Sequence, residues 1–574
     1  MKNSMHKADF CVVGGGLAGM SAAIAAARHG LKTVLMHDRP VLGGNASSEV
    51  RMWVCGAHGK NNLETGIVEE IQLENLYRNN YPNYSVWDSV LYEKVRFEPN
   101  ITVLLNCSCT EAQMSGKRIR SVKGWQGTAE TWHTVEASFF SDCSGASILA
   151  PLTGADFRIG REAASEFSED IEPPTADRRT MGMSCLIQAR ETDRPHGFVP
   201  PSWANKYSDE SAFPHRGHEL KGSQNFWWLE LGGEHDSIHD TETLRDELLK
   251  VAFGVWDHIK NHGDHGAANW VLDWMGFLPG KRESRRYIGD HIMTQNDVRA
   301  EGRFEDIIAY GGWSMDDHHP AGFRHPGAPT IFHPAPSPYG IPYRSLFSKN
   351  IENLFFAGRN ISVTHAAMSS TRVMATCATL GQAVGTAAFV AKEKGLSPRG
   401  VYQKELAFLQ QTLMGDDAYL PWKKRDIPAI SKRAELTASA GNAEAVRNGI
   451  DRPVGDSFNG WQAPVSSSIA YRFAKNETVH EARIIFDSDL NRGGKNMPSY
   501  YPLAMPEYKV PASMVKTFRV EGEVDGVWKT VFRTENNYQR LVRVALKDPV
   551  SAIRLVPEAT WGSVDATVFA FDVR

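Results

Sequence analysis

The stretch Ala8-Asp9-Phe10-Cys11-Val12-Val13-Gly14-Gly15-Gly16-Leu17-Ala18-Gly19 decides the fold. Residues 8–13 predict a buried strand that runs directly into the glycines. The alanine-rich residues 20–30 predict a helix, which Gly30 stops. A second strand is predicted over residues 32–36. Strand, turn, helix and strand in this order form the context that a G-x-G-x-x-G pattern requires.

The glycines of this turn each have a physical role in binding a dinucleotide. Gly14 permits the tight turn, Gly16 lets the backbone approach a pyrophosphate, and Gly19 lets the helix pack close to the strand. Leu17 and Ala18 lie at the helix N-terminus, whose free N–H groups and positive dipole end favour phosphate oxygens. The sequence therefore predicts dinucleotide binding at residues 14–19.

The end of the second strand departs from the usual pattern. An acid there normally accepts hydrogen bonds from the adenosine ribose, but His37 stands at that position and Asp38 follows it. Either His37 takes the ribose hydroxyls, or Asp38 reaches them after a small shift of register. A third alternative leaves both away from the cofactor. Arg39, which comes next, is a further candidate for cofactor contact.

A second glycine pair favours FAD over NAD. Gly43-Gly44-Asn45 resembles the FAD-dependent oxidoreductases of the glutathione-reductase-like superfamily, in which such a turn lies against the cofactor. The resemblance implies that the next residues run towards the flavin, with Ser47, Ser48 and Arg51 in its neighbourhood. His58 is a candidate for lining the flavin pocket or carrying a covalent flavin link.

Two later turns resemble the same superfamily. Cys143-Ser144-Gly145 follows a short predicted strand and is similar to the turn that passes under the adenine side of FAD. Gly358-Arg359 stands where the superfamily has Gly-Asp. Because arginine cannot accept a hydrogen bond, we expect Arg359 to neutralise the pyrophosphate instead.

A long helix is predicted over residues 366–394, rich in small residues, with Gly381 and Gly385 allowing close packing. Its N-terminus, around residues 365–369 and including Ser369, resembles the helix that points at the flavin pyrimidine edge. A helix N-terminus there would stabilise the negative charge of a reduced flavin. The alternative is a merely buried helix.

Four motifs occur together at residues 42–51, 280–286, 341–346 and 358–362. This combination resembles the bacterial FAD-dependent oxidoreductase family, which is often found beside carbohydrate-degrading enzymes. The resemblance covers residues 5–400. It implies a fold and an FAD cofactor, but the family has no single reaction.

The chain of 574 residues is too long for one hydrophobic core. We predict an α/β protein with a Rossmann-like FAD-binding domain at residues 1–153 and 338–400, and an inserted α+β substrate domain at residues 154–337. A linker is predicted over residues 401–430. After it, short alternating runs predict a C-terminal β-sandwich at residues 431–574, a jelly roll of galactose-binding-like type.

Composition narrows the choice of partners. A net charge of −4 gives no reason to expect nucleic acid or an anionic membrane. No stretch is predicted to cross a bilayer, and the polar N-terminus predicts no signal peptide. Seven scattered cysteines are expected as free thiols, so the predicted location is the cytoplasm.

The inserted region carries the candidates for proton transfer. His is the best general acid or base near neutral pH. His318 and His319 fall in the run Asp316-Asp317-His318-His319-Pro320, and His333 follows later in the chain. The alternative is a solvated loop. Adjacent residues of a strand point apart, so no metal site is predicted in this run, and none is predicted elsewhere.

A cluster of arginines is the second candidate for substrate contact. Arg282, Arg285 and Arg286 are candidates for binding an anionic or polyhydroxylated substrate, or the flavin carbonyls. The alternative is a structural network in which they pair with Glu283 and neighbouring acids. Tyr343 is expected close to the flavin because it precedes the last FAD strand.

The predicted function is hydride transfer between flavin N5 and a polar, carbohydrate-like small molecule. One alternative is reduction of an activated double bond in an anionic substrate, with the arginines as a carboxylate clamp. Another is a carbohydrate-binding protein that keeps FAD structurally. The electron acceptor and the oligomeric state stay open.

Overall fold

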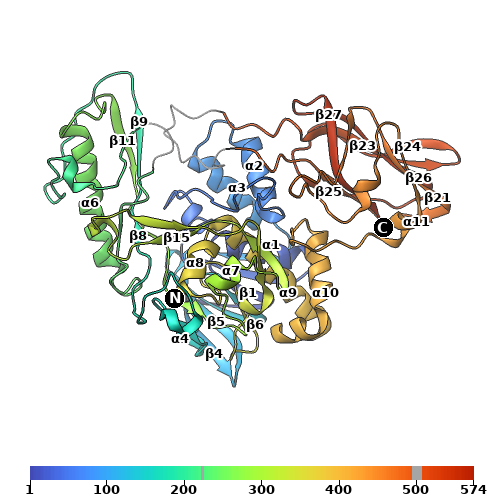
Figure 1. Cartoon of the computed structure of the whole chain (residues 1–574). Helices are drawn as coiled ribbons and strands as arrows, with labels where there is room; N and C mark the ends of the chain where they lie inside the picture. The colour runs from blue at the N-terminus through green and yellow to red at the C-terminus, as the bar shows by residue number, and fades with distance from the viewer. Residues whose placement is uncertain (221–224, 494–506) are drawn as a thin grey trace. The chain divides into compact units, whose positions relative to one another are not determined.

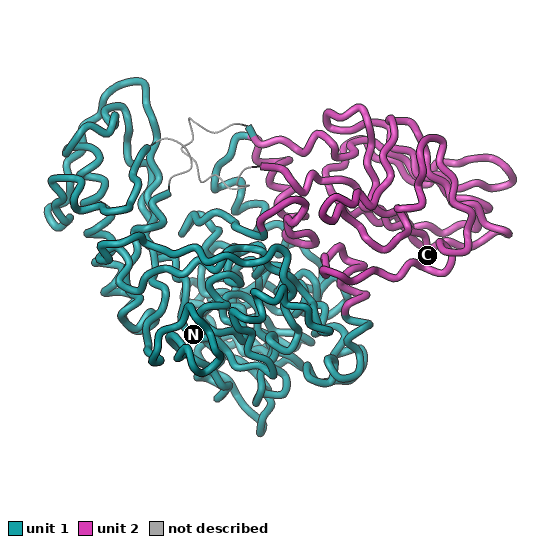
Figure 2. The backbone as a smooth tube through the Cα atoms, in the orientation of Figure 1, with its two compact units in different colours: residues 1–57, 81–409, 495–507 teal, residues 58–80, 410–494, 508–574 magenta. Residues whose placement is uncertain are grey.

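The computed structural model describes residues 1–220, 225–493 and 507–574, which form two compact units (Figure 2). Most of the first unit comes from residues 1–57 and 81–409. The second combines residues 58–80 with residues 410–493 and 508–574. The short segment 58–80 thus leaves the predicted FAD-binding region and joins the C-terminal part of the chain.

A parallel sheet in the order β3-β2-β1-β6-β18 forms the centre of the first unit (Figure 1). Its strands are β3 (Ile101–Leu104), β2 (Thr33–Met36), β1 (Lys2–Val13), β6 (Thr131–Asp142) and β18 (Leu354–Phe356). The antiparallel strands β4 (Cys107–Ser115) and β5 (Arg118–Gln126) extend the first half of β6. The predicted Rossmann-like arrangement is therefore present.

Two apolar helices cover this sheet in close contact with each other. A Cβ atom added at Gly381 of α9 (Met374–Lys394) would lie 1.9 Å from the Ala18 carbonyl oxygen of α1 (Leu17–Arg28). At Gly385, such an atom would lie 2.2 Å from the Ala22 carbonyl oxygen. These glycines allow the close packing that the sequence predicts.

The same helix α9 is long and apolar enough to cross a membrane by length and composition. The prediction that no stretch has this character was therefore wrong. Because 89% of its apolar window is buried inside the protein, α9 has the surroundings of a core helix.

The helix predicted over residues 366–394 is in fact two helices. α8 (His365–Thr371) ends at Arg372, Val373 is extended, and α9 begins at Met374. The Ala375 N–H donates to the Cys55 carbonyl, and the Arg372 guanidinium donates to Asp316. The Ala375 N–H thus bonds to another segment of the chain, whereas in a continuous helix it would donate to the Thr371 carbonyl. The Arg372 side chain adds a tertiary hydrogen bond at the same break.

The inserted region has its own core around α6 (Thr241–Asn261), which lies beside the pair β9 (Ile187–Glu191) and β11 (Trp270–Met275) (Figure 1). Trp228, Trp256 and Trp270 are all at most 3% exposed within this core. Three of the seven tryptophans of the region therefore pack inside the insert and do not line an open pocket.

Smaller elements complete the first unit. The strand pairs are β8 (Met183–Ser184) with β10 (Glu230–Leu231) and β12 (Gly280–Lys281), β7 (Phe157–Arg158) with β13 (Arg286–Tyr287), β14 (Ile307–Gly311) with β17 (Tyr339–Pro342), and β15 (Met315–His318) with β16 (Thr330–His333). The short helices are α3 (Tyr84–Arg96), α4 (Leu149–Thr153), α5 (Ala164–Phe167) and α7 (Gln295–Arg299).

The second unit is a β-sandwich. Its five-stranded sheet has the order β19 (Glu435–Ala438), β21 (Ile469–Thr478), β26 (Pro549–Thr560), β23 (Val515–Val524) and β24 (Val527–Thr534). Its four-stranded sheet has the order β20 (Trp461–Pro464), β27 (Asp565–Val573), β22 (Glu481–Phe486) and β25 (Leu541–Ala545). Side chains of both sheets share one core, so the predicted β-sandwich is present.

Helix α2 (Ile67–Arg78) belongs to this second unit because its apolar face enters the sandwich core. Leu73 and Leu76 are buried there, and Tyr77 stacks on Tyr538 with ring centroids 3.9 Å apart. The predicted linker begins with helix rather than coil, since α10 (Pro398–Gly415) covers its first part; α11 (Ala429–Arg433) precedes β19.

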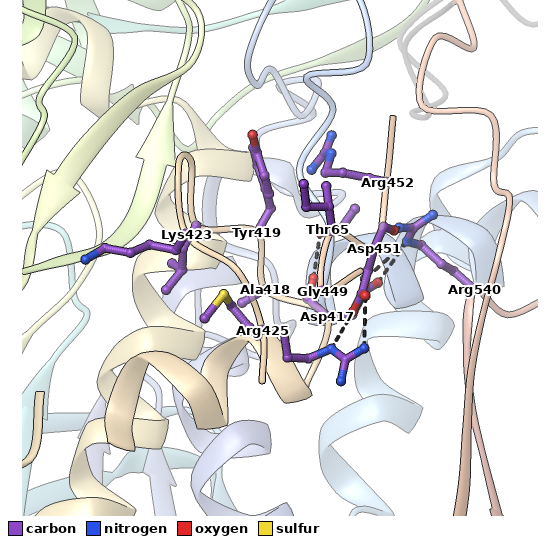
Figure 3. Close-up of a pocket in the computed structure, with 13 residues that line it drawn as sticks. Thr65, Asp417, Ala418, Tyr419, Lys423, Arg425, Gly449, Asp451, Arg452 and Arg540 are labelled. Carbon is purple, nitrogen blue, oxygen red and sulfur yellow. Dashed lines mark hydrogen bonds and ion pairs between the residues drawn. The ribbon is translucent and has the colours of Figure 1, made fainter. Parts of the chain in front are cut away.

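A small cavity in the second unit is lined by charged side chains that already have partners (Figure 3). Arg540 pairs with Asp417 at 3.0 Å, and Arg425 pairs with Asp451 at 2.9 Å. The cavity volume is about 30 Å³, far below the roughly 300–1,000 Å³ of small-molecule sites. This cavity has room for water, not for a sugar ring.

The close contact of α1 and α9 predicts the effect of Gly381→Ala. Helix propensity alone would stabilise the variant by roughly 1 kcal/mol. Because the new methyl group meets the Ala18 carbonyl, we expect instead a loss of about 1–3 kcal/mol in the free energy of unfolding. Thermal unfolding followed by circular dichroism measures the sign. Gly197→Ala, which adds a methyl group in open space, is the control and should change stability by no more than about 0.5 kcal/mol.

Candidate active site

Three turns meet at the carboxyl edge of the parallel sheet. They follow β1, β6 and β18, and contain Gly14, Cys143-Ser144-Gly145 and Gly358-Arg359. A Cβ atom at Gly14 would lie 2.4 Å from the Cys143 backbone, and one at Gly145 would lie 2.7 Å from the Arg359 guanidinium. The three turns that the sequence analysis identified separately are therefore in contact.

Gly19 and Gly16 have the roles that the fingerprint predicts. A Cβ atom at Gly19 would lie 1.8 Å from the Gly14 carbonyl oxygen, so only glycine lets helix and turn approach this closely. At Gly16, the nearest atom would be the Gly44 Cα at 3.8 Å. Gly16 also caps α1 without a side chain, and Leu17 and Ala18 form the first turn. The helix N-terminus thus begins at a loosely packed position, where a Cβ atom would have one neighbour at ordinary contact distance, as an anion site requires.

The second glycine turn packs directly against the first. The Gly43 N–H donates to the Gly15 carbonyl at 2.8 Å. Gly43 and Gly44 have φ values of 105° and 62°, a conformation that favours glycine. The turn closes with Ser47, whose hydroxyl donates to the Gly44 carbonyl at 2.8 Å.

Arg359 is a cation without an acidic partner in the described part of the chain. Its Nε atom is buried and makes no hydrogen bond there. Burial lowers the pKa of Arg359 to about 10, and the nearby charge of Arg39 contributes. Burial, followed by the charge of Arg359, lowers the pKa of Lys281 to about 8. A group of cations at glycine turns is complementary to an anion that is bound there.

The two ring nitrogens of His37 are both engaged by the backbone. Nδ1 accepts from the Gly15 N–H at 3.0 Å, and Nε2 donates to the Val41 carbonyl at 3.0 Å. His37 therefore stabilises the two glycine turns and has no nitrogen left for a ribose. The exposed carboxylate of Asp38 is the better candidate for the ribose hydroxyls.

Several other predicted cofactor contacts bond to the protein itself. Asn45 donates to the Lys281 carbonyl, and the Ser48 N–H donates to Asp88. The Ser144 hydroxyl donates to Asp142 at 2.6 Å. These residues shape the turns, and their predicted contacts with a cofactor stay predictions.

Arg51 and Arg39 also have partners of their own. Arg51 donates to Gln188, and its guanidinium lies between the rings of Tyr84 and Trp274, 4.8 and 4.4 Å from their centroids. Arg39 lies 3.5 Å from Glu49. Burial lowers the pKa of Arg51. His58 falls in the second compact unit, so its predicted flavin contact stays a prediction.

His318 lies inside a buried chain of charges. Its Nδ1 is 2.6 Å from Glu230, and its Nε2 is 3.4 Å from Asp316. Arg282 is 3.3 Å from the same Glu230 and donates to Ser184, while Arg372 pairs with Asp316. His318 and Arg282 therefore share Glu230, in line with the alternative in which the arginines form a structural network.

Other predicted catalytic residues are not placed for proton transfer. Tyr343 is fully buried and donates to the Pro398 carbonyl at 3.0 Å, and burial raises its pKa well above the ordinary value. Arg285 donates to the Ala146 carbonyl. His333 is half-buried at the end of β16, and the ring of His319 stacks on His325 with centroids 3.6 Å apart. The hydroxyl of Tyr343 lies in the interior, which disfavours proton transfer by this residue, and its catalytic role stays a prediction.

The site contains a histidine that the sequence analysis did not select as catalytic. His365, the first residue of α8, is 2.8 Å from Glu283 and 3.1 Å from Asp317. Burial alone would lower its pKa, but Glu283 and Asp317 raise it well above the ordinary value. Glu283 also pairs with the buried Arg286. The run Asp316-Asp317-His318 was the available signal, since Asp316 is a partner of His318 and Asp317 is a partner of His365.

Buried acids occupy the N-terminus of α8. The His365 N–H donates to Glu162 at 2.9 Å, and the Ala366 N–H donates to Glu172 at 2.8 Å. Ser369 donates to the Ala366 carbonyl within the same helix. These N–H groups and Ser369 have protein partners, and their expected position at the flavin stays a prediction. The start of α9, where the Ala375 N–H meets Cys55, is the other helix N-terminus in this segment.

Comparison with known proteins identifies the family. The model of the family described as FAD dependent oxidoreductase matches residues 9–413. The chain belongs to the FAD dependent oxidoreductase family. No curated protein matches the chain.

Three of the solved structures that match the chain share little sequence identity with it. Sdh1 of Mycobacterium smegmatis, in complex with UQ1, is 13% identical over 72% of this chain and 77% of its own, with a TM-score of 0.28. A family 32 carbohydrate-binding module from Clostridium perfringens NanJ, in complex with galactose, is 12% identical over 25% of this chain and 94% of its own, with a TM-score of 0.18. A module of that family from Streptococcus pneumoniae EndoD is 15% identical over 25% of this chain and 97% of its own, with a TM-score of 0.19.

The residues present fit an FAD cofactor. The loosely packed Gly16, the glycine turn at Gly44 and the unpaired Arg359 suit a pyrophosphate. Asp38 suits the adenosine ribose. Bound FAD is thus expected to supply the anion that the cations of this edge lack.

The fit predicts that Arg359→Met weakens FAD binding but leaves the stability of the FAD-free protein unchanged. We expect FAD to bind about 10–100-fold more weakly, because charge-assisted hydrogen bonds to the pyrophosphate are lost. The FAD-free protein should keep its stability, since no described carboxylate loses a partner. Titration of FAD-free protein by flavin fluorescence measures the first effect, and thermal unfolding measures the second. Arg118→Met, at an exposed pair with Glu352, is the control.

Glu172 predicts a dependence of stability on pH. Burial raises its pKa from 4.5 to about 7, and one carboxylate oxygen has no partner in the described structure. Between these values the folded protein keeps a proton that the unfolded chain releases, so stability falls as pH rises. We therefore compare the free energy of unfolding of Glu172→Gln with that of the parent. The difference should favour the variant by on the order of 1–3 kcal/mol more at pH 8 than at pH 4.

Urea unfolding at several pH values measures this difference. Glu166→Gln is the control, because Arg158 lowers the pKa of that more exposed carboxylate. An equal gain at pH 4 and pH 8 for Glu172→Gln would contradict the assignment.

Proposed function

We propose that this FAD-dependent oxidoreductase moves a hydride between a polar, carbohydrate-like small molecule and flavin N5, with Asp317 as the general base. Bound FAD supplies the hydride acceptor. The observation that carries the proposal is the Asp317–His365 pair, in which a partly exposed carboxylate is held by a buried histidine at 3.1 Å.

In this proposal, Asp317 receives a proton from a substrate hydroxyl. Its side chain is 20% exposed, whereas His365 and Glu283 behind it are at most 1% exposed. Burial alone would raise the pKa of Asp317, but the hydrogen bond and charge of His365 lower it, so the carboxylate is ionised at neutral pH. Removal of the hydroxyl proton is the step that oxidation of an alcohol needs besides hydride loss.

Polar groups beside Asp317 favour a polar substrate. Arg161 acts electrostatically on Asp317, and Asp317 in turn acts on the half-buried His319. His319 keeps a role in substrate binding in this proposal. Donors and acceptors around one carboxylate suit a polyhydroxylated molecule better than an apolar one.

The arrangement of the arginines disfavours the reductase alternative. A carboxylate clamp needs guanidinium groups that can reach the substrate. Arg282 and Arg286 are 7% and 1% exposed, and both pair with buried glutamates. They are therefore committed to the protein interior. A cytoplasmic location and an undetermined electron acceptor remain part of the proposal.

Replacing Asp317 tests the base directly. We expect Asp317→Asn to bind FAD normally and to be reduced by its substrate about 10²–10⁴-fold more slowly. Anaerobic stopped-flow absorbance, with sugars, glycosides and hydroxy acids as substrates, measures the rate at which the flavin band bleaches. The rate should partly recover at high pH, where the hydroxyl needs less help in losing its proton.

Asp236→Asn is the matched control, because Asp236 also pairs with a histidine, His239 at 2.9 Å, but in an exposed position. Unchanged flavin reduction in Asp317→Asn would refute the base assignment. Bleaching by none of the alcohols, together with reoxidation of reduced enzyme by unsaturated acids, would favour the reductase alternative.

A further inference from the structure

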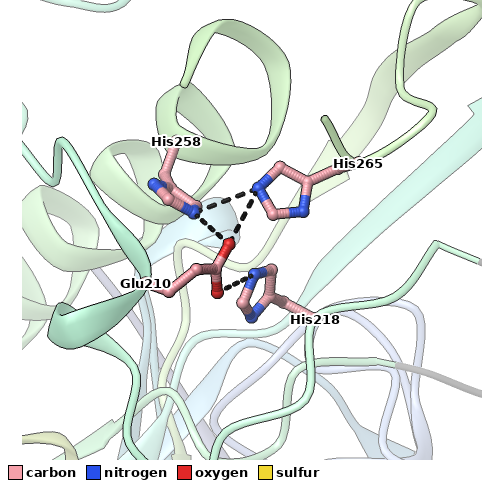
Figure 4. A group of neighbouring side chains, drawn as sticks. All are labelled: Glu210, His218, His258 and His265. Carbon is pink, nitrogen blue, oxygen red and sulfur yellow. Dashed lines mark hydrogen bonds and ion pairs between the residues drawn. The ribbon is translucent and has the colours of Figure 1, made fainter. Parts of the chain in front are cut away.

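Three histidines and one glutamate, none of which takes part in the proposed reaction, converge in the inserted region (Figure 4). Glu210 begins a short 3-10 turn, His218 follows in the next loop, His258 lies in the last turn of α6, and His265 lies between α6 and β11. One ligand atom from each side chain lies within 4.8 Å of all the others.

The distances suit a tetrahedral metal. The His258 Nε2 and His265 Nε2 atoms are 3.1 Å apart, and both lie near the same Glu210 oxygen, at 3.2 and 3.3 Å. The other Glu210 oxygen is 3.2 Å from the His218 Nε2. Ligands at about 2.0–2.1 Å from a tetrahedral zinc ion lie roughly 3.3–3.4 Å from one another.

The backbone fixes which ring nitrogens face the centre. The His218 Nδ1 lies 2.9 Å from the Arg216 carbonyl, and the His258 Nδ1 lies 3.0 Å from the Tyr207 carbonyl. A carbonyl only accepts, so both Nδ1 atoms carry the proton and, in the neutral rings, both Nε2 atoms present a lone pair. A backbone carbonyl behind the second ring nitrogen is the usual support of a metal-binding histidine.

These lone pairs point at carboxylate oxygens, an arrangement that needs a positive charge between them. Either protons or a metal ion can supply it. Protonation of all three rings would place three like charges with ring centroids no more than 5.5 Å apart, against a single carboxylate. One divalent cation satisfies all four ligands at once.

We propose that Glu210, His218, His258 and His265 bind one divalent first-row transition metal ion, with Zn²⁺ as the preferred ion. Four protein ligands leave no open position, so the site is structural. It ties the loop of residues 210–218 to the end of α6 and to the turn before β11. His258 is 1% exposed, whereas the Glu210 side chain is 64% exposed, so the ion enters from the solvent side.

Metal analysis of the full-length FAD-loaded protein tests the site. After chelation and equilibrium dialysis against ZnCl₂, we expect one zinc ion per chain by mass spectrometry, and a higher unfolding temperature than in the chelated protein. Glu210→Gln and His265→Gln should each weaken zinc binding at least ~10–100-fold, the range for lost outer-shell partners. Their flavin absorbance should stay unchanged.

Glu210→Gln changes an exposed side chain, so it tests the site even if a buried histidine variant does not fold. His239→Gln, at an exposed histidine of the same region, is the matched control and should bind zinc as the parent does. Absence of stoichiometric zinc in the parent would overturn the proposal. So would zinc binding that Glu210→Gln and His265→Gln reduce no more than His239→Gln does.

Discussion

Contact of backbone with backbone at the carboxyl edge of the β3-β2-β1-β6-β18 sheet is the constraint on which the first unit depends. Gly19 meets the Gly14 carbonyl, Gly14 meets the Cys143 backbone, and Gly381 meets the Ala18 carbonyl. No side chain fits at these positions, so helix α1, its turn and helix α9 approach as closely as peptide groups allow. The same approach places the helix N-terminus beside the loosely packed Gly16, which is what a pyrophosphate needs.

Buried charge is arranged in two different ways around this edge. Arg282 and Arg286 have glutamate partners in the interior, and breaking such a pair would leave an uncompensated charge. Arg359 has no acidic partner in the described structure. The first arrangement holds the inserted region in place, whereas the second is completed by an anionic cofactor. Paired and unpaired arginines thus separate structural positions from cofactor-binding ones.

Histidines show the same division. His37 and His318 use both ring nitrogens on protein groups and serve the fold. His365 uses both nitrogens on acids, but one of these acids, Asp317, is partly open to solvent. In the inserted region, His218 and His258 use only one nitrogen on the backbone and turn the other towards a common centre. The groups that the two ring nitrogens of a histidine face, and not the residue type, indicate its chemistry.

The sequence by itself determined the β-α-β unit with its glycine turn, the family and its cofactor, and most strands of the sandwich. These features are local: a glycine spacing, an alanine-rich run and alternating apolar residues each predict structure from neighbours in the chain. Only the tertiary structure decided that His365 meets Glu283 and Asp317, that Tyr343 is interior, and that Glu210 joins three histidines. Most of these contacts join residues tens of positions apart, and their pairing depends on packing that no local pattern records.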